Sequence, residues 1–206
     1  FRSHVREIID YLAEVEKAQF KEVGLTVGRF PGSMVLTYRD LCKRLRERPD
    51  PQIEKKIWRI GMRAFSERRY RKQGMIPGAR ETLDFLKDRG DLLYCVSAGD
   101  PKVKEKKYRA YGLGRWFDEE HFRVVPWEKL PELQRIRGLH PDIAGYMVGD
   151  SIGSDLVPAK EAGFTPVWVP SQAVWDHGEL VKDLPEGTIK LEQIGDLLRL
   201  IPSRLV

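Results

Sequence analysis

Hydrophobic residues recur with helical spacing through the first third of the chain. Each of three segments places its apolar side chains on one face of a helix, which predicts three packed helices. The stripes are Val5, Ile8, Ile9, Leu12 and Val15; Met34, Val35, Tyr38, Leu41, Cys42 and Leu45; and Ile53, Ile57, Ile60, Ala64 and Phe65. Residues 24–33, punctuated by glycine and proline, are expected to form a loop. Residues 1–74 show no strand pattern and are predicted to be all-helical.

After residue 74 the pattern changes to short apolar runs that alternate with helical segments. Strands are predicted at 92–96, 122–125, 146–148 and 166–169, and a short strand and a last helix within 188–200. The helices between them are predicted at 78–89, 101–111, 131–137 and 155–162. This alternation predicts an α/β fold with a doubly wound, mostly parallel sheet. We therefore expect an all-α domain over residues 1–74 and an α/β core domain over 75–206.

Composition narrows the class of protein. The chain has 206 residues, of which 41% are hydrophobic and 33% charged. No apolar run approaches the roughly 20 residues that a membrane-spanning helix needs, and no signal peptide is visible. Cys42 and Cys95 are too few for a disulfide framework, so buried thiols and a cytoplasmic location are expected. The histidines do not cluster in the sequence and are expected to be surface or packing residues: His4, His121, His140 and His177.

Charge is unevenly distributed between the two parts. Residues 1–74 hold 18 Lys and Arg against 10 Asp and Glu, whereas residues 75–206 hold 18 against 21. The basic part favours an anionic substrate or nucleic acid, although solvated helix faces would produce the same excess. Candidate contacts for a substrate anion are Arg29, Arg39, Arg68, Arg69, Arg71 and Lys72.

Polar residues follow three of the predicted strands, and parallel strands bring such positions to one edge of a sheet. Ser97 follows strand 92–96, where a hydroxyl beside glycine-assisted backbone N–H groups suits a phosphate oxygen. Alternatively, Ser97 or Asp100 only caps the next helix. Lys129 follows strand 122–125 and could neutralise a phosphoryl oxygen. Its alternative role is that of an ordinary exposed lysine.

The third strand end carries two carboxylates. Asp150 and Asp155 flank a Gly/Ser loop directly after strand 146–148. Asp150 stands where a hard cation could bind, and Mg²⁺ needs only one or two carboxylates because it keeps several waters. Asp155 could instead be an N-cap, which would leave Asp150 at the strand end unexplained.

The order of these sites resembles the haloacid dehalogenase-like superfamily of hydrolases. The order is strand–Ser97, strand–Lys129 and strand–GDSxxxD, followed by the stretch 158–163. The resemblance implies that Ser97 belongs to the second motif, Lys129 to the third, and Asp150 with Asp155 to the fourth. It is strongest for phosphatase-type members with a helical cap, and residues 1–74 would be that cap.

One departure from the family pattern concerns the nucleophile. The family's first motif is an apolar strand that ends in Asp-x-Asp, and no Asp-x-Asp occurs in this chain. The resemblance implies that this strand is the middle of the sheet. We expect it upstream of residue 1, because a sheet without its central strand would leave two neighbours unpaired.

The resemblance implies Mg²⁺-dependent hydrolysis of a small phosphorylated, anionic substrate through an aspartyl-phosphate. Asp150 would hold the metal, Lys129 would offset negative charge, Ser97 would donate to a phosphoryl oxygen, and Asp155 would orient Lys129 or a metal-bound water.

Two alternatives remain open. The first is a 2-haloacid dehalogenase of the same superfamily, which uses the aspartate on carbon and needs no metal. The second is a non-catalytic relative that binds phosphate or nucleic acid. Against nucleic acid, the aromatic residues of the basic part lie within helical stripes or loops rather than on an exposed stacking platform. No membrane partner is expected.

Overall fold

The computed structural model describes residues 2–171 and 183–200, and its chain divides into two compact units. One unit consists of Phe1–Gln73 with Gly99–Ala110, and the other of Gly74–Ala98 with Tyr111–Val206. We refer to them as the helical unit and the sheet unit.

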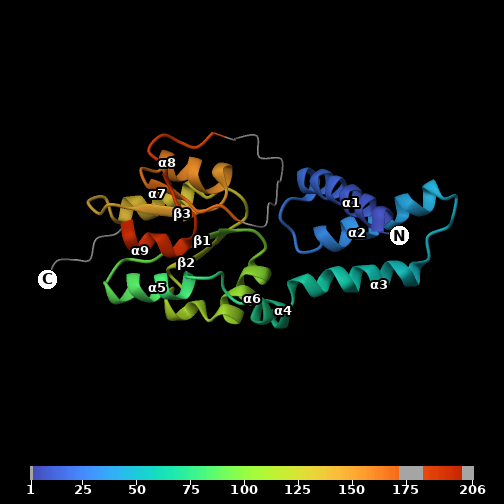
Figure 1. The fold of residues 1–206 in the computed structure, drawn as a ribbon, viewed down its shortest axis with the longest axis horizontal. Coiled ribbons are helices and arrows are strands. Elements are labelled where there is room, and N and C mark those ends of the chain that lie inside the picture. Colours follow the sequence, from blue (N-terminus) through green and yellow to red (C-terminus); the bar gives the residue numbers. More distant parts are fainter. Residues whose placement is uncertain (1, 172–182, 201–206) are drawn as a thin grey trace. The chain divides into compact units, whose positions relative to one another are not determined.

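The helical unit contains the helices predicted from the three apolar stripes, the helix predicted at 101–111, and an additional short helix, α4 (Figure 1). Its elements are α1 (Arg2–Val23), α2 (Arg29–Arg44), α3 (Pro51–Met62), η1 (Arg63–Phe65), α4 (Glu67–Gln73) and α6 (Pro101–Tyr111). Helix α2 begins within the segment 24–33 that was predicted to be a loop. Its first turn accommodates Pro31, whose fixed φ suits a helix start, so the proline there does not break the helix.

Helices α1 and α2 are joined by polar contacts as well as by their apolar stripes. The Tyr11 hydroxyl donates a 2.8 Å hydrogen bond to Oδ2 of Asp40. A buried ion pair joins Arg29 to Glu16 at 3.3 Å. Burial lowers the pKa of Arg29, and the charge of Glu16 opposes that shift. The carboxylates of Asp40 and Glu16 therefore help to fix the position of α1 along α2.

Helix α3 begins at a capped turn and crosses α2 closely. The Asp50 side chain accepts a 2.7 Å hydrogen bond from the backbone N–H of Gln52, which caps the helix. At the crossing, a Cβ on Gly61 would lie 2.9 Å from Cα of Pro31. A glycine at this position thus allows the two backbones to approach.

Helix α6 packs against α4 within the helical unit. The ammonium of Lys107 lies 5.3 Å from the centroid of the Tyr70 ring, and Arg109 is 3.6 Å from Glu67. Burial lowers the pKa of Lys107. These contacts explain why a helix that follows the first strand of the sheet unit belongs to the other unit.

The sheet unit has the predicted alternation of strands and helices, which confirms the α/β class. Its first elements are α5 (Ala79–Asp88), β1 (Cys95–Ala98), η2 (Leu113–Arg115), β2 (Phe122–Val125), α7 (Leu130–Leu139) and β3 (Tyr146–Gly149). Those that follow are the π-helix η3 (Ile152–Leu156), α8 (Val157–Glu161), β4 (Thr165–Trp168), β5 (Ile189–Lys190), η4 (Ile194–Asp196) and α9 (Leu197–Leu200).

All strand pairs are parallel, but the described strands form two sheets instead of one. The first sheet has the order β1-β2 and the second the order β3-β4-β5. Strand β1 begins at Cys95, later than the predicted 92–96, because its pairing with β2 starts at Cys95 opposite Phe122. Ser97 consequently lies within the strand, opposite Val124, and not after it.

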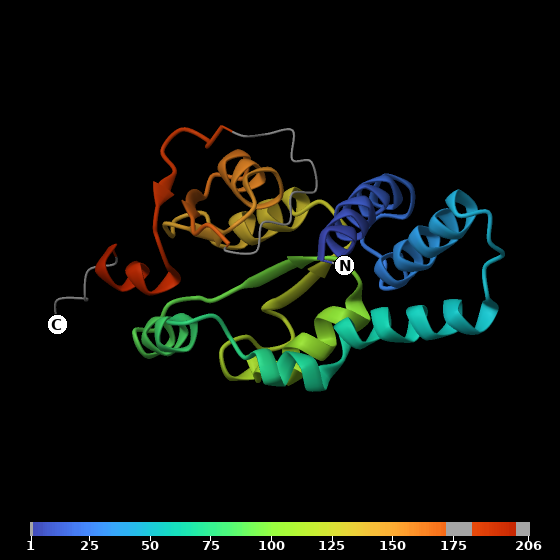
Figure 2. The same cartoon turned by 45° about the vertical axis from the view of Figure 1, so that its right-hand side comes forward.

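The two sheets share one layer of helices. Leu133 of α7 and Ala159 of α8 form a buried cluster, and Val96 of β1 and Met147 of β3 both pack against it. Figures 1 and 2 agree that β1 lies on the side of its sheet that is nearer to β3. The strand edges of β1 and β3 that are not paired within the described residues therefore belong to one layered core.

Two of the histidines pack against one tyrosine just before β1, in agreement with the expectation that they are surface or packing residues. The Tyr94 hydroxyl lies 3.0 Å from Nε2 of His140, and the Tyr94 and His121 rings are 4.5 Å apart. Sequence separation hid this group because parallel pairing places the residues before β1 and β2 side by side. His177 lies outside the described residues.

Further predictions concern membranes and thiols. Within residues 2–171 and 183–200, no helix combines the length and apolar character required to cross a membrane. Cys42 is buried, as predicted, whereas Cys95 is only half-buried.

Candidate active site

Lys129 and Asp155 form a buried ion pair at the carboxyl ends of the strands. The Lys129 ammonium donates a hydrogen bond to Oδ1 of Asp155. The side chains are only 11% and 6% exposed. Lys129 is therefore not an ordinary exposed lysine, and its charge lies in a site of low solvent access where electrostatic interactions are strong.

The ion pair links the ends of the two sheets. Lys129 follows β2 of the first sheet and immediately precedes α7. Asp155 follows β3 of the second sheet. The pair therefore connects these strands at the edge where ligands bind in parallel α/β folds.

The turn of η3 holds the Asp155 carboxylate. Its Oδ2 accepts a 3.1 Å hydrogen bond from the backbone N–H of Ser151. The Ser151 hydroxyl accepts a 3.1 Å hydrogen bond from the N–H of Ser154, so Ser151 caps this element. The alternative that Asp155 is an N-cap is wrong, because Asp155 lies inside η3. The helix predicted at 155–162 is likewise divided into this π-helix and α8.

Asp150 directly follows the last residue of β3 and is exposed. Its backbone oxygen accepts a 3.1 Å hydrogen bond from Nε1 of Trp168 at the end of β4. Tertiary pairing of β3 with β4 thus positions the residue, a contribution of Trp168 that sequence reasoning missed. The available signal for this contact was a tryptophan, Trp168, near the end of the predicted strand 166–169.

The donor set permits Asp150 to be one ligand of a hard cation. Its carboxylate oxygens are of the type that Mg²⁺ prefers. Both oxygens of Asp155 already accept hydrogen bonds, from Lys129 and Ser151. Among the described residues, no three His, Cys, Asp or Glu side chains are grouped to hold a metal. Asp150 therefore fits Mg²⁺ as a single carboxylate ligand completed by waters and by oxygens from elsewhere.

Ser97 is half-buried near the end of β1, and the structure gives it no hydrogen bond to Lys129, Asp150 or Asp155. The alternative that Ser97 or Asp100 caps α6 is confirmed for Asp100 and not for Ser97. Oδ1 of Asp100 instead accepts hydrogen bonds from the N–H groups of Lys102 and Val103, at 2.9 and 3.2 Å. Because Asp100 caps the helix, the Ser97 hydroxyl is not needed for capping and can donate a hydrogen bond to a ligand.

The candidate basic residues of the helical unit are largely engaged within that unit. Arg29 pairs with Glu16. Arg39 donates hydrogen bonds of 2.7 and 2.8 Å to the two oxygens of Glu54. Arg71 is 2.6 Å from Glu67. The positive charge of these residues is thus partly neutralised by ion pairs within and between helices.

Comparison with known proteins places the arrangement in a family context. A sequence model described as "Hydrolase: haloacid dehalogenase-like hydrolase" matches residues 1–163. Comparison with curated protein sequences gives no match.

Solved structures with this fold are more informative. A haloacid dehalogenase-like family hydrolase from Xanthomonas campestris has a TM-score of 0.67 at 19% identity, covering 97% of this chain and 82% of the other. The magnesium-bound putative HAD-hydrolase YfnB from Bacillus subtilis has a TM-score of 0.58 at 16% identity, covering 94% and 82%. A 2-haloacid dehalogenase from Pseudomonas syringae has a TM-score of 0.53 at 18% identity, covering 93% and 80%.

Proposed function

The chain belongs to the haloacid dehalogenase-like hydrolase family, and from that premise we propose that it is a Mg²⁺-dependent phosphatase of a small phosphorylated substrate. The observation that carries the proposal is the buried Lys129–Asp155 ion pair beside Asp150. A cation held at a strand end, next to a carboxylate that suits a hard metal, provides positive charge for a transferring phosphoryl group.

The nucleophile is assigned to a strand that inserts between β1 and β3. Neither strand has a partner on that side among the described residues, while Val96 and Met147 lie against the same core cluster. An unpaired parallel edge leaves backbone N–H and C=O groups without ladder partners. A strand ending in Asp-x-Asp would pair with both edges and place its first carboxylate near Lys129.

In the proposed reaction, the carboxylate of that strand attacks phosphorus and the ester oxygen leaves with a proton from a neighbouring acid. Water then hydrolyses the aspartyl-phosphate and releases phosphate. Lys129 offsets negative charge on the attacking carboxylate and the phosphoryl oxygens, and Ser97 donates a hydrogen bond to one of them. Asp155 holds Lys129 in place, so it is a positioning residue. Asp150 would hold Mg²⁺, which supplies charge stabilisation to the phosphoryl group when bound.

Residues 1–74, which form most of the helical unit, are proposed as the substrate-selecting cap. Its excess of basic residues favours an anionic substrate.

The proposal is tested by hydrolysis of p-nitrophenyl phosphate with the full-length polypeptide, with and without Mg²⁺. Asp150→Asn should lower the Mg²⁺-dependent rate by about 10²-fold or more. Asp142→Asn is the matched control. Asp142 is exposed like Asp150, but it precedes β3 and therefore lies away from the carboxyl end of the strand. A wild-type rate in Asp150→Asn would overturn the metal assignment.

A second candidate function is dehalogenation of a 2-haloacid, because one structural neighbour carries that name. Such a reaction uses the same carboxylate on carbon and has no need of Asp150 as a metal ligand. Chloride release from 2-chloropropionate that persists in EDTA, with no phosphatase activity, would favour this candidate. Release of phosphate that EDTA abolishes would favour the phosphatase.

A further inference from the structure

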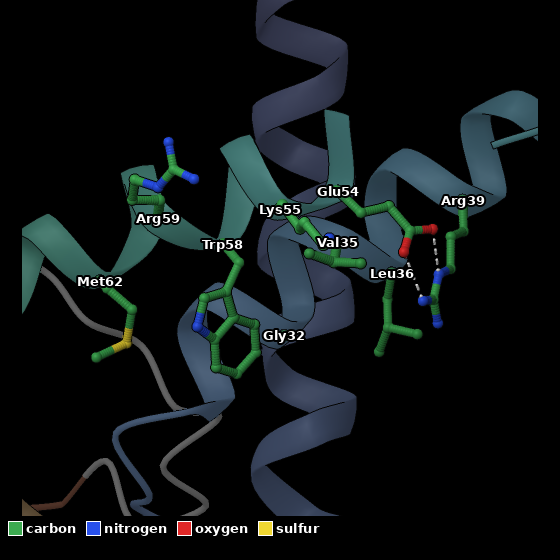
Figure 3. A pocket seen from close by; sticks show the side chains of 9 residues that line it. All are labelled: Gly32, Val35, Leu36, Arg39, Glu54, Lys55, Trp58, Arg59 and Met62. Carbon is green, nitrogen blue, oxygen red and sulfur yellow. Dashed lines mark hydrogen bonds and ion pairs between the residues drawn. The ribbon is translucent and has the colours of Figure 1, made fainter. Parts of the chain in front are cut away.

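The helical unit contains a groove between α2 and α3 that none of the proposed catalytic residues lines. We call it the α2–α3 groove, and its volume is about 660 Å³. That volume lies within the range of roughly 300–1,000 Å³ found for small-molecule sites. Its lining, drawn in Figure 3, consists of Gly32, Val35, Leu36, Arg39, Glu54, Lys55, Trp58, Arg59 and Met62.

An aromatic side chain forms the wall of this groove. Trp58 is 44% exposed although it is large and apolar, and its ring points toward Gly32 in Figure 3. A Cβ on Gly32 would lie 3.8 Å from Cζ3 of Trp58, an ordinary van der Waals contact, so this glycine lies directly beside the ring. An exposed indole beside a glycine is a surface on which a flat apolar group can stack.

The charges around the groove are unbalanced toward positive. The Arg39 guanidinium and the Glu54 carboxylate neutralise each other through two hydrogen bonds. Lys55 and Arg59, one helical turn apart on α3, form no ion pair with any described residue. The groove therefore has an apolar wall and two cations that form no ion pair with a carboxylate in residues 2–171 or 183–200.

We propose that the α2–α3 groove binds a small aromatic anion, with its ring against Trp58 and its carboxylate, sulfonate or phosphate group near Lys55 and Arg59. Ring burial would supply the apolar contribution and the two cations would supply the preference for an anion. This site goes beyond the proposed phosphatase reaction, and its test measures binding alone. Failure of one proposal therefore leaves the other standing.

The experiment uses the full chain and 8-anilino-1-naphthalenesulfonate as the probe, with binding followed by fluorescence titration. N-phenyl-1-naphthylamine, which has the same rings without the sulfonate, reports the apolar contribution. We expect the sulfonate to bind more tightly. Lys55→Gln/Arg59→Gln should weaken sulfonate binding by about tenfold and leave binding of the neutral probe unchanged.

Two further variants isolate the groove. Lys56→Gln/Arg48→Gln removes two exposed charges of the same unit outside the groove and should leave the binding of both probes unchanged. Gly32→Leu adds a large side chain to the lining of the groove next to Trp58 and should abolish binding of both probes. Circular dichroism should show that the helices of this variant remain folded.

Three results would overturn the proposal. The first is equal affinity for the two probes, which would indicate only an apolar surface. The second is equal loss of sulfonate binding in the groove and control charge variants, which would indicate a general effect of net charge. The third is concentration-dependent self-association, seen by light scattering and abolished by Gly32→Leu, which would show that a second copy of the chain occupies the groove.

Discussion

The Asp155 carboxylate lies directly against the α-carbon of Gly149. A Cβ at position 149 would lie 2.4 Å from Oδ2 and 2.5 Å from Cβ of Asp155, separations that atoms cannot adopt. The last residue of β3 must therefore lack a side chain for Asp155 to reach Lys129.

Gly149→Ala should displace Asp155 and separate it from Lys129. We expect a loss of about 1–3 kcal/mol in the free energy of unfolding, together with a fall of at least tenfold in phosphatase activity. Gly138→Ala is the control, because a Cβ at Gly138 of α7 meets no atom within 4 Å. Denaturant titration and the rate of p-nitrophenyl phosphate hydrolysis measure both effects. Equal behaviour of the two variants would contradict the packing argument.

The Lys129–Asp155 pair predicts strongly non-additive mutational effects. Lys129→Met leaves a buried carboxylate without its cation and should destabilise the fold by about 3–5 kcal/mol. Lys129→Met/Asp155→Leu removes both charges and should recover a large part of that loss. Glu105→Gln breaks the exposed pair with Arg109 and should cost far less, since solvent screens it. A double-mutant cycle from chemical denaturation provides the measurement. Additive single effects would contradict a coupled pair.

The hydrogen bond from Trp168 allows the position of Asp150 to be perturbed without changing its carboxylate. Trp168→Phe removes the Nε1 donor to the Asp150 backbone oxygen. Its expected effect is to raise the Mg²⁺ concentration at half-maximal phosphatase activity by about tenfold, while the rate at saturating Mg²⁺ changes little. The comparison variant is Trp127→Phe, because Trp127 is an exposed tryptophan of the β2–α7 loop. A change in the saturated rate alone would instead indicate a general loss of structure.

The ion pairs of Glu132 are expected to make the free energy of unfolding depend on pH. Hydrogen bonding from Arg135, and to a smaller extent the charges of Arg135 and Arg123, lower the pKa of Glu132 below its ordinary 4.5. Its contribution to stability is therefore complete above pH 4.5 and is lost as pH falls through the lower pKa of the folded state. Because both arginines are about 42–43% exposed, the contribution is about 1 kcal/mol or less.

Glu132→Gln should accordingly be less stable than wild type at pH 7, and the difference should shrink toward pH 3. Glu128→Gln, at an exposed carboxylate outside any described ion pair, is the control and should show little difference at either pH. Chemical denaturation at a series of pH values is the measurement. A difference for Glu132→Gln that grows on acidification would contradict the sign of the shift.

Local signals in the chain predicted most elements correctly. Apolar periodicity located α1, α3 and most of α2, and the buried runs located β2, β3 and β4, because these signals depend on residues that are neighbours in sequence. The first strand was placed too early. Its apolar run is continuous from 92 to 96, but pairing with β2 selects Cys95–Ala98, and pairing depends on residues more than twenty positions away.

The candidate site shows the same division. The residue types after the strands identified Ser97, Lys129, Asp150 and Asp155 as candidates, because parallel strands carry their polar groups to one edge. Contacts made at long range determined the rest: Asp155 joins Lys129 across 26 positions, and Trp168 holds Asp150 across 18. The family resemblance implied that Asp155 orients Lys129 or a metal-bound water, whereas the local hint of the second contact was a tryptophan near the end of the predicted strand 166–169.

Periodicity, composition and motif order were therefore sufficient for the α/β class, the helical first third and the family resemblance, since each is a property of short stretches of chain. Which side chains become buried together required the folded structure. The helical stripe over residues 53–65 predicted packing, yet Ile53 and Ile60 of α3 are 42% and 48% exposed. Burial is decided by the surfaces that other elements present, and those surfaces exist only after distant segments have come together.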